Sequence, residues 1–130
     1  MKHYQFLLVG LIFSGTTAYA KTSWQCTNQQ AEISCNQQNC QVETEQFTPF
    51  KIHVSNHQEI RICAYSGCWS GKVKHTNSTA FDQYFTQQLV WNENEARDEN
   101  FSITIDRTQN LGTLLGSSFI LPLICESKDL

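Results

Sequence analysis

The stretch CAYSGCWSGK, residues 63–72, holds the densest group of chemically distinctive residues in the chain: two cysteines, two glycines, a tyrosine and a tryptophan in ten positions. Three kinds of site use such residues. Thiolates separated by up to four residues suit a zinc knuckle, a serine between glycines suits a nucleophile elbow, and two cysteines across a short loop suit a stapled β-hairpin. The neighbouring residues decide between these alternatives.

A hairpin in which Cys63 faces Cys68 agrees with its flanking residues. Gly67 ends the four-residue loop, where a left-handed conformation favours glycine. This register also creates a β-branched–aromatic pair and an opposite-charge pair, namely Ile62 with Trp69 and Glu59 with Lys72. The sequence therefore predicts a disulfide between Cys63 and Cys68 that staples a hairpin.

The same register sorts the side chains of the hairpin onto two faces. The apolar face, which we expect to join the core, carries Ile60, Ile62, Trp69 and Val73. The opposite face carries one aromatic and three cationic side chains, namely Tyr65, Arg61, Lys72 and Lys74. We interpret these four as a small basic, aromatic-tipped patch that contacts a partner. The alternative is that the lysines only prevent edge-to-edge strand pairing.

The remaining four cysteines are expected to form two further disulfides. Cys35 and Cys40 repeat the spacing of the first pair, and the analogous register sets Ile33 against Val42 but also places two like charges, Glu32 and Glu43, opposite each other. By elimination, Cys26 then pairs with Cys125 and joins the two ends of the domain. Six cysteines in a small exported chain are typical of a disulfide framework.

The first twenty residues have the three parts of a secretory signal. Lys2 and His3 precede the apolar run FLLVGLIF at 6–13, and Ala18-Tyr19-Ala20 is a small-x-small cleavage site. The apolar run is shorter than the roughly 20 residues that span a bilayer, so we expect residues 1–20 to be removed. No cysteine near the cut offers a lipid anchor. We therefore expect a soluble periplasmic or secreted protein.

The expected mature chain, residues 21–130, is long enough for one domain with a modest core. It has eight Lys and Arg against twelve Asp and Glu, because Lys2 is lost with the signal. This net charge of −4 gives no reason to expect nucleic-acid binding.

Short segments rich in β-branched and aromatic residues alternate with Asn, Gln, Ser and Gly clusters, which is an all-β pattern. The expected strands are 23–26, 31–35, 40–44, 50–54, 59–64, 69–75, 88–91, 101–106, 111–115 and 118–125. We predict a small antiparallel barrel or sandwich of eight to ten short strands. Residues 80–89 allow one short helix instead, because Phe81, Tyr84, Phe85 and Leu89 follow a helical stripe.

The chain offers few groups for a catalytic, cofactor or metal site, and we expect none of the three. His53 and His57 have the spacing of helical metal ligands but fall on a predicted strand and turn, so we expect them at the surface. Asp106 and Glu126 are candidates for paired carboxylates, yet nothing in the sequence places them together. The serine of GCWSG stands one position late for a nucleophile elbow.

The hairpin CAYSGCWSG and the closing segment FILPLIC at 119–125 resemble small disulfide-bonded exported proteins of Gram-negative bacteria with no assigned function. Ser66-Gly67-Cys68-Trp69 is similar to the Ser-Gly-x-x-aromatic stretch of the periplasmic inhibitors of c-type lysozyme, which are small antiparallel barrels. Here the aromatic residue comes one position early, and a cysteine is inserted. The second resemblance implies a barrel with an inhibitory loop.

These features favour a non-enzymatic periplasmic binding or inhibitor module. Its expected partner is an envelope protein or a polyanionic surface. Two alternatives stay open, namely a small periplasmic hydrolase whose acids and bases meet only in the fold, and a structural component of the envelope.

Overall fold

The computed structural model describes residues 15, 23–93, 95–96 and 99–128. Its strands are β1 Trp24–Thr27, β2 Glu32–Asn36, β3 Asn39–Glu43, β4 Lys51–Ser55, β5 Glu59–Cys63, β6 Cys68–Asn77, β7 Phe81–Trp91, β8 Glu95–Ala96, β9 Ser102–Asp106, β10 Leu111–Leu115 and β11 Phe119–Ser127. No helix occurs among the described residues, and so none is available there to cross a membrane.

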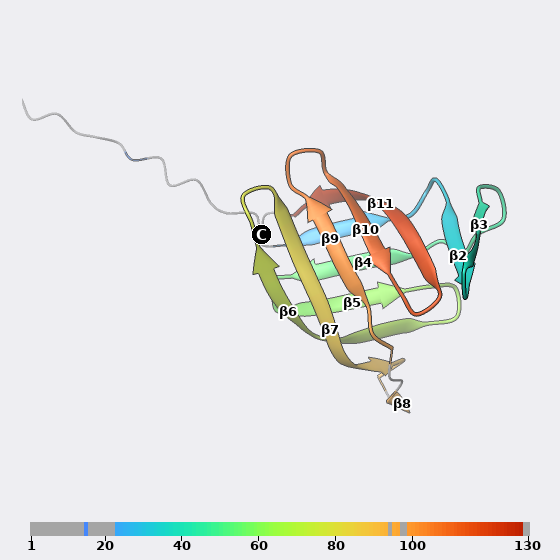
Figure 1. Ribbon diagram of the computed structural model, residues 1–130. Coiled ribbons are helices and arrows are strands. Elements are labelled where there is room, and N and C mark those ends of the chain that lie inside the picture. Colours follow the sequence, from blue (N-terminus) through green and yellow to red (C-terminus); the bar gives the residue numbers. More distant parts are fainter. Residues whose placement is uncertain (1–14, 16–22, 94, 97–98, 129–130) are drawn as a thin grey trace, which may run out of the picture.

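Eight strands close into an antiparallel barrel, in the order β1-β4-β5-β6-β7-β9-β10-β11 (Figure 1). Closure comes from β1, which pairs with β4 on one edge and with β11 on the other. The short β8 extends from β7, and the β2–β3 hairpin lies outside the ring and is attached to β11. The expected small all-β fold is confirmed, and of the two predicted architectures it is the barrel.

The barrel interior is filled by alternate residues of its strands, as expected for a ring of eight. In β4 and β5 the buried positions are Ile52, Val54, Ile60 and Ile62, and their neighbours along each strand point outward. The largest fully buried side chains elsewhere are Trp24, Tyr84, Leu89, Ile103, Ile105, Leu114 and Leu121. A single core therefore holds the outward-facing residues of these strands in position.

The short helix that the sequence allowed near residues 80–89 does not form, because residues 81–89 belong to the long strand β7. A β-bulge explains the misleading pattern: the ladder with β6 shifts by one residue opposite Gly71, where Gln88 takes a left-handed φ of 51°. The shift lets both Tyr84 and Leu89 face the interior. A Cβ on Gly71 would lie 2.9 Å from a methyl carbon of Leu89, so a larger residue there would displace the buried Leu89 side chain.

All three predicted disulfides are present. Cys63–Cys68 and Cys35–Cys40 staple the β5–β6 and β2–β3 hairpins, and Cys26–Cys125 joins β1 to β11 at the barrel closure. Three disulfides indicate an oxidising, non-cytoplasmic location. The expected signal peptide lies outside the described residues, apart from Gly15.

Candidate functional site

The stapled β5–β6 hairpin has the predicted register. Cys63 pairs with Cys68, with their Cα atoms 4.0 Å apart, and Ile62 lies opposite Trp69. The backbone N–H of Ala64 donates a hydrogen bond to the carbonyl of Gly67, at 2.9 Å, which closes the loop. Tyr65 stands at the tip of this loop and is 83% exposed. The disulfide and this hydrogen bond both close the loop, and together they make the tip rigid.

The predicted faces of the hairpin are also observed. Ile60 and Ile62 are buried, and the half-buried Trp69 and Val73 pack against the core. The four outward residues, Arg61, Tyr65, Lys72 and Lys74, are all exposed.

These four outward residues do not form one compact patch. Tyr65 lies at the tip, whereas Lys74 lies six residues beyond Cys68 along β6, on the order of 20 Å further away at the usual rise of a strand. Only Arg61 and Lys72 are brought together, in one groove on the outer face of the barrel.

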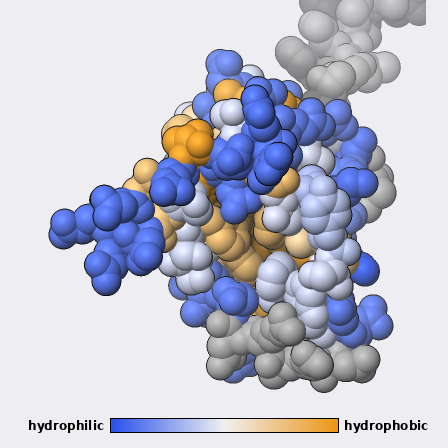
Figure 2. Space-filling model, turned by 90° about the vertical axis from the view of Figure 1, so that its right-hand side faces the viewer, coloured by the Kyte–Doolittle hydropathy of each residue, from blue (hydrophilic) through white to orange (hydrophobic). Residues whose placement is uncertain are grey.

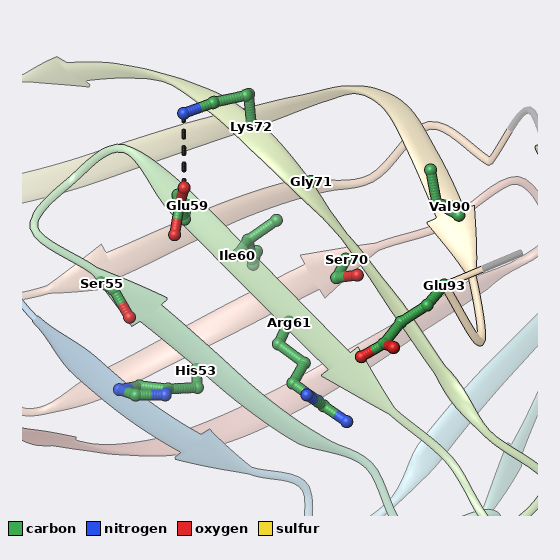
Figure 3. Close-up of a pocket in the computed structure, with 10 residues that line it drawn as sticks. All are labelled: His53, Ser55, Glu59, Ile60, Arg61, Ser70, Gly71, Lys72, Val90 and Glu93. Atoms are coloured by element: carbon green, nitrogen blue, oxygen red, sulfur yellow. Dashed lines mark hydrogen bonds and ion pairs between the residues drawn. The ribbon is translucent and has the colours of Figure 1, made fainter.

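This groove runs over β4, β5 and β6, and the end of β7 and the turn after it form its far wall (Figure 3). It has a volume of about 480 Å³ and is lined by His53, Ser55, Glu59, Ile60, Arg61, Ser70, Gly71, Lys72, Val90 and Glu93. Arg61 and Glu93 reach into the groove from opposite sides. At one end, Lys72 Nζ lies 3.3 Å from Glu59 Oε1 in an exposed ion pair.

The charges of the groove are nearly balanced, because Arg61 and Lys72 face Glu59 and Glu93. Lys72 is neutralised by its ion pair, although such an exposed pair contributes only about 0–1 kcal/mol to stability. Arg61 makes no ion pair or hydrogen bond to any described side chain. Considering the described residues alone, the groove therefore offers a guanidinium without an ionic partner, beside hydroxyl, imidazole and carboxylate groups.

A second group of functional side chains lies at the opposite end of β5, in the turn that joins it to β4. Asn56 and His57 both have left-handed φ values, 52° and 56°, and the N–H of Gln58 donates to the carbonyl of Ser55 at 3.0 Å. Gly and Asn usually occupy such positions. His57 was predicted to be a surface residue, yet it is half-buried, because its ring stacks on His75 of β6.

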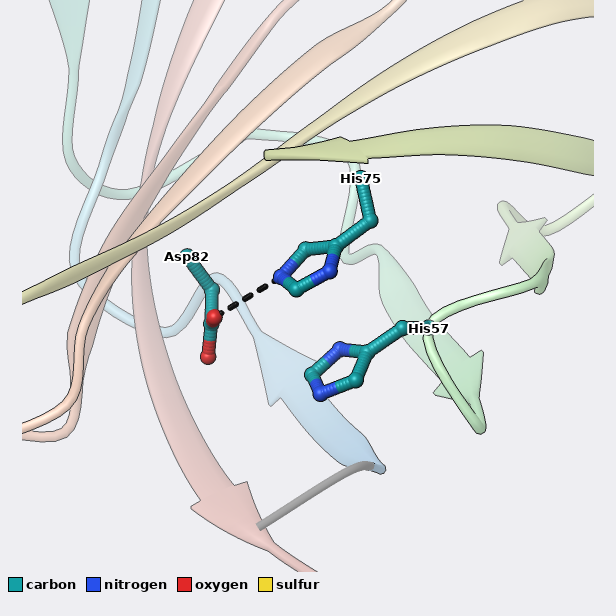
Figure 4. A group of neighbouring side chains, drawn as sticks. All are labelled: His57, His75 and Asp82. Carbon is teal, nitrogen blue, oxygen red and sulfur yellow. Dashed lines mark hydrogen bonds and ion pairs between the residues drawn. The ribbon is translucent and has the colours of Figure 1, made fainter. Parts of the chain in front are cut away.

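The stacked imidazoles of His57 and His75 are 3.9 Å apart and parallel to within 3° (Figure 4). His75 Nε2 donates to Asp82 Oδ1 at 2.9 Å, and His57 Nδ1 shares a hydrogen bond of 2.7 Å with the hydroxyl of Tyr84. Burial and the neighbouring Asp82 raise the pKa of Tyr84 well above its usual value. Tyr84 is therefore neutral at physiological pH.

Asp82 is the centre of this network and is only 2% exposed. Besides His75, it accepts hydrogen bonds from Trp24 Nε1 at 3.1 Å and from Arg107 at 2.9 Å. Arg107 also donates to the carbonyls of Ser78 and Thr79. The buried carboxylate thus has three donors, one of which, Arg107, is also its ionic partner.

This network was not evident in the sequence, because its side chains come from three strands, β1, β6 and β7, and from two loops. The available signal was an aspartate, Asp82, within a segment rich in apolar residues.

His57, His75 and Asp82 have the ligand types of a metal site, with one ligand atom from each lying within 4.8 Å of the others. Their orientation does not suit a metal, because an imidazole nitrogen binds metal in the plane of its ring, and two parallel stacked rings cannot both point at one ion. Asp82 Oδ1 already accepts from His75 and Arg107. As arranged, the group is a hydrogen-bond network.

The two other carboxylates considered from the sequence are held separately. Asp106 Oδ1 accepts hydrogen bonds from the hydroxyl and the backbone N–H of Thr108, which lower the pKa of this carboxyl. Glu126 Oε2 accepts from Lys128 Nζ at 3.2 Å. No hydrogen bond joins Asp106 to Glu126 in the described structure. They do not form an acid–base pair.

Comparison of the chain with protein-family models, with curated proteins and with solved structures found no match.

Proposed function

We propose that this protein is a non-enzymatic periplasmic binding or inhibitor module that contacts its partner with the stapled hairpin tip and the groove beside it. One observation carries the proposal, namely that Tyr65, at 83% exposure, stands at the tip of a loop closed by a disulfide and a backbone hydrogen bond. An exposed tyrosine contributes nothing to the core, so its value lies in contacts outside the molecule.

The rigidity of the tip favours binding. A partner that covers Tyr65 and Arg61 loses little entropy in ordering the backbone, which the disulfide already holds. Tyrosine and arginine are also the side chains most often found at the energetic centre of interfaces. A narrow projecting tip fits a concave partner surface, such as the cleft of an enzyme.

The groove narrows the chemistry of the expected partner. Because Glu59 and Glu93 offset the cations of the groove, a specific carboxylate that reaches Arg61 is a better match than a uniformly polyanionic surface. The resemblance of Ser66-Gly67-Cys68-Trp69 to the loop of c-type lysozyme inhibitors supports a cleft that contains carboxylates as the partner surface.

The hydrolase alternative has weaker support from the geometry. The groove brings His53 beside Arg61, and no carboxylate bonds to this histidine among the described residues. The histidine–carboxylate pair that does exist, His75 with Asp82, does not line the groove, and its carboxylate also accepts a hydrogen bond from Arg107.

A binding experiment with the oxidised residues 21–130 tests the proposal. The protein is immobilised, and captured envelope proteins and a purified c-type lysozyme are measured against Tyr65→Ala, Arg61→Glu and the double variant. Lys74→Glu is the matched control, because it reverses an equally exposed charge outside the groove. We expect each single change at the tip or groove to weaken capture about tenfold, and the control to bind as the unchanged protein does.

All variants should unfold at the same urea concentration as the unchanged protein, because none of the altered side chains is in the core. A partner that the Tyr65→Ala/Arg61→Glu variant captures with unchanged affinity would place the function on another surface.

A further inference from the structure

The β2–β3 hairpin leaves one strand edge open outside the closed barrel (Figure 1). Apart from the two-residue β8, β3 is the only described strand that is paired on one edge alone. All five of its residues are exposed. Figure 2 shows the side of the molecule on which this hairpin lies in Figure 1, and exposed hydrophobic residues are visible there between hydrophilic ones. The open edge is therefore accessible to another strand.

The hydrogen-bonding groups on this edge can be assigned from the ladder. Cys35 and Cys40 are a directly opposed pair with Cα atoms 4.1 Å apart, which is the narrow, non-hydrogen-bonded kind. In agreement, the N–H of Cys35 points away from β3 and donates to the carbonyl of Ser118 at 2.8 Å. By alternation, the N–H and C=O groups of Cys40 and Val42 point to the open edge.

The edge lacks the usual protection against pairing. Its sequence NCQVE contains no lysine, no proline and no bulge. The carboxylate of its one charged residue, Glu43, accepts the backbone N–H groups of Glu45 and Gln46 at 2.9 and 3.1 Å. Val42, at 65% exposure, instead presents an apolar side chain.

We propose that β3 pairs with β3 of a second copy of this chain, antiparallel and centred on Gln41. In this register Cys40 of each copy lies opposite Val42 of the other. The outward N–H and C=O groups of these residues then form four main-chain hydrogen bonds, two on each side of a two-fold axis. Val42 then lies beside the disulfide of the second copy, since residues directly opposed in a ladder share a face.

The charges are compatible with this register and favour the antiparallel orientation over the parallel one. Glu43 of each copy meets the neutral Asn39 of the other, so no like charges are opposed. A parallel, in-register pairing would set Glu43 against Glu43, which is unfavourable. The disulfide holds both hairpins in shape before they meet. The edge is thus complementary to itself in hydrogen bonding, in charge and in its apolar contact.

One pair of five-residue strands buries less area than a standard interface, so we expect a weak dimer with a dissociation constant on the order of 0.1–1 mM. Sedimentation equilibrium of the oxidised residues 21–130 over this range measures it. Val42→Pro removes one outward N–H and leaves the bonds to β2 in place, so self-association should fall at least about tenfold. Val42→Thr keeps that N–H and the branched shape, and it should remain close to the unchanged protein.

A cysteine variant tests the register directly and independently of any effect of proline on the hairpin. Gln41→Cys places two thiols opposite each other at the two-fold axis, so oxidation should produce a covalent dimer. Asn39→Cys is the matched control, because Asn39 faces Glu43 of the second copy, and it should remain monomeric. A protein that is monomeric at millimolar concentration, or equal cross-linking of the two variants, would overturn the proposal.

Discussion

Asp82→Asn is the substitution for which the structure makes the strongest quantitative prediction. The change keeps the size of the side chain but replaces one acceptor oxygen by an NH₂ donor. With its oxygen toward His75 and Arg107, the new amide turns its NH₂ toward Trp24 Nε1, which is itself a donor. The opposite orientation keeps the bond to Trp24 and loses the other two.

The cost follows from these contacts. Replacing the charged acceptor of a buried N–H by a second donor costs about 1–3 kcal/mol, and Trp24 is fully buried, so water does not take the place of that acceptor. The bonds from His75 and Arg107 become bonds to a neutral oxygen, which loses about 1 kcal/mol more because charge-assisted bonds are the stronger ones. We therefore expect Asp82→Asn to lower the free energy of unfolding by about 2–4 kcal/mol.

Urea unfolding of the oxidised protein at pH 7, followed by tryptophan fluorescence, measures this loss. Glu126→Gln is the control, because Glu126 is exposed and its one side-chain bond to a described residue is to Lys128. It should change stability by less than about 0.5 kcal/mol. If Asp82→Asn lowers the free energy of unfolding by no more than this control does, the buried network does not stabilise the barrel.

Two further predictions concern the barrel closure and the buried tyrosine. Replacing Cys26 and Cys125 together by alanine should lower the free energy of unfolding in urea by about 4–5 kcal/mol, because 99 positions separate this pair. Replacing either short staple should lower it by about 2 kcal/mol. Equal losses for the long and the short disulfides would contradict this expectation. In a Tyr65→Phe variant of residues 21–130, Tyr84 is the only tyrosine. Its raised pKa adds no pH dependence below about pH 10 and should make stability fall as pH rises beyond it. Phenolate absorbance that appears near pH 10 in the folded barrel would disprove the raised pKa of Tyr84.

The β5–β6 hairpin was predictable because its determinants are local. Cys63, Cys68 and Gly67 lie within one short loop, and the pairs that set the register follow directly on either side. The β2–β3 hairpin was predictable for the same reason, although Glu32 does face Glu43. That unfavourable pair is tolerated because both carboxylates accept hydrogen bonds from the loop after β3. Glu43 accepts the backbone N–H groups of Glu45 and Gln46, and Glu32 accepts that of Thr48.

The character of β7 was not predictable from its own residues. The helical spacing of Tyr84 and Leu89 arises from the bulge, which depends on the close approach of Gly71 in the neighbouring strand. The buried network around Asp82 was missed for a similar reason, since Trp24 and Arg107 are 58 and 25 positions away from it in sequence. The residues next to Asp82 in the sequence carry no signal of contacts with residues so far away along the chain.

Composition and local spacing were enough to predict the all-β character, the two short staples and, through six cysteines, the oxidising location, because each of these depends on nearby residues or on residue counts. The folded barrel was needed to show that β1 closes the ring by pairing with β11, which sets Cys26 directly opposite Cys125. It also separated Tyr65 from Lys74 and brought His57 onto His75. These outcomes depend on how a closed barrel positions distant segments, and no local spacing encodes that geometry.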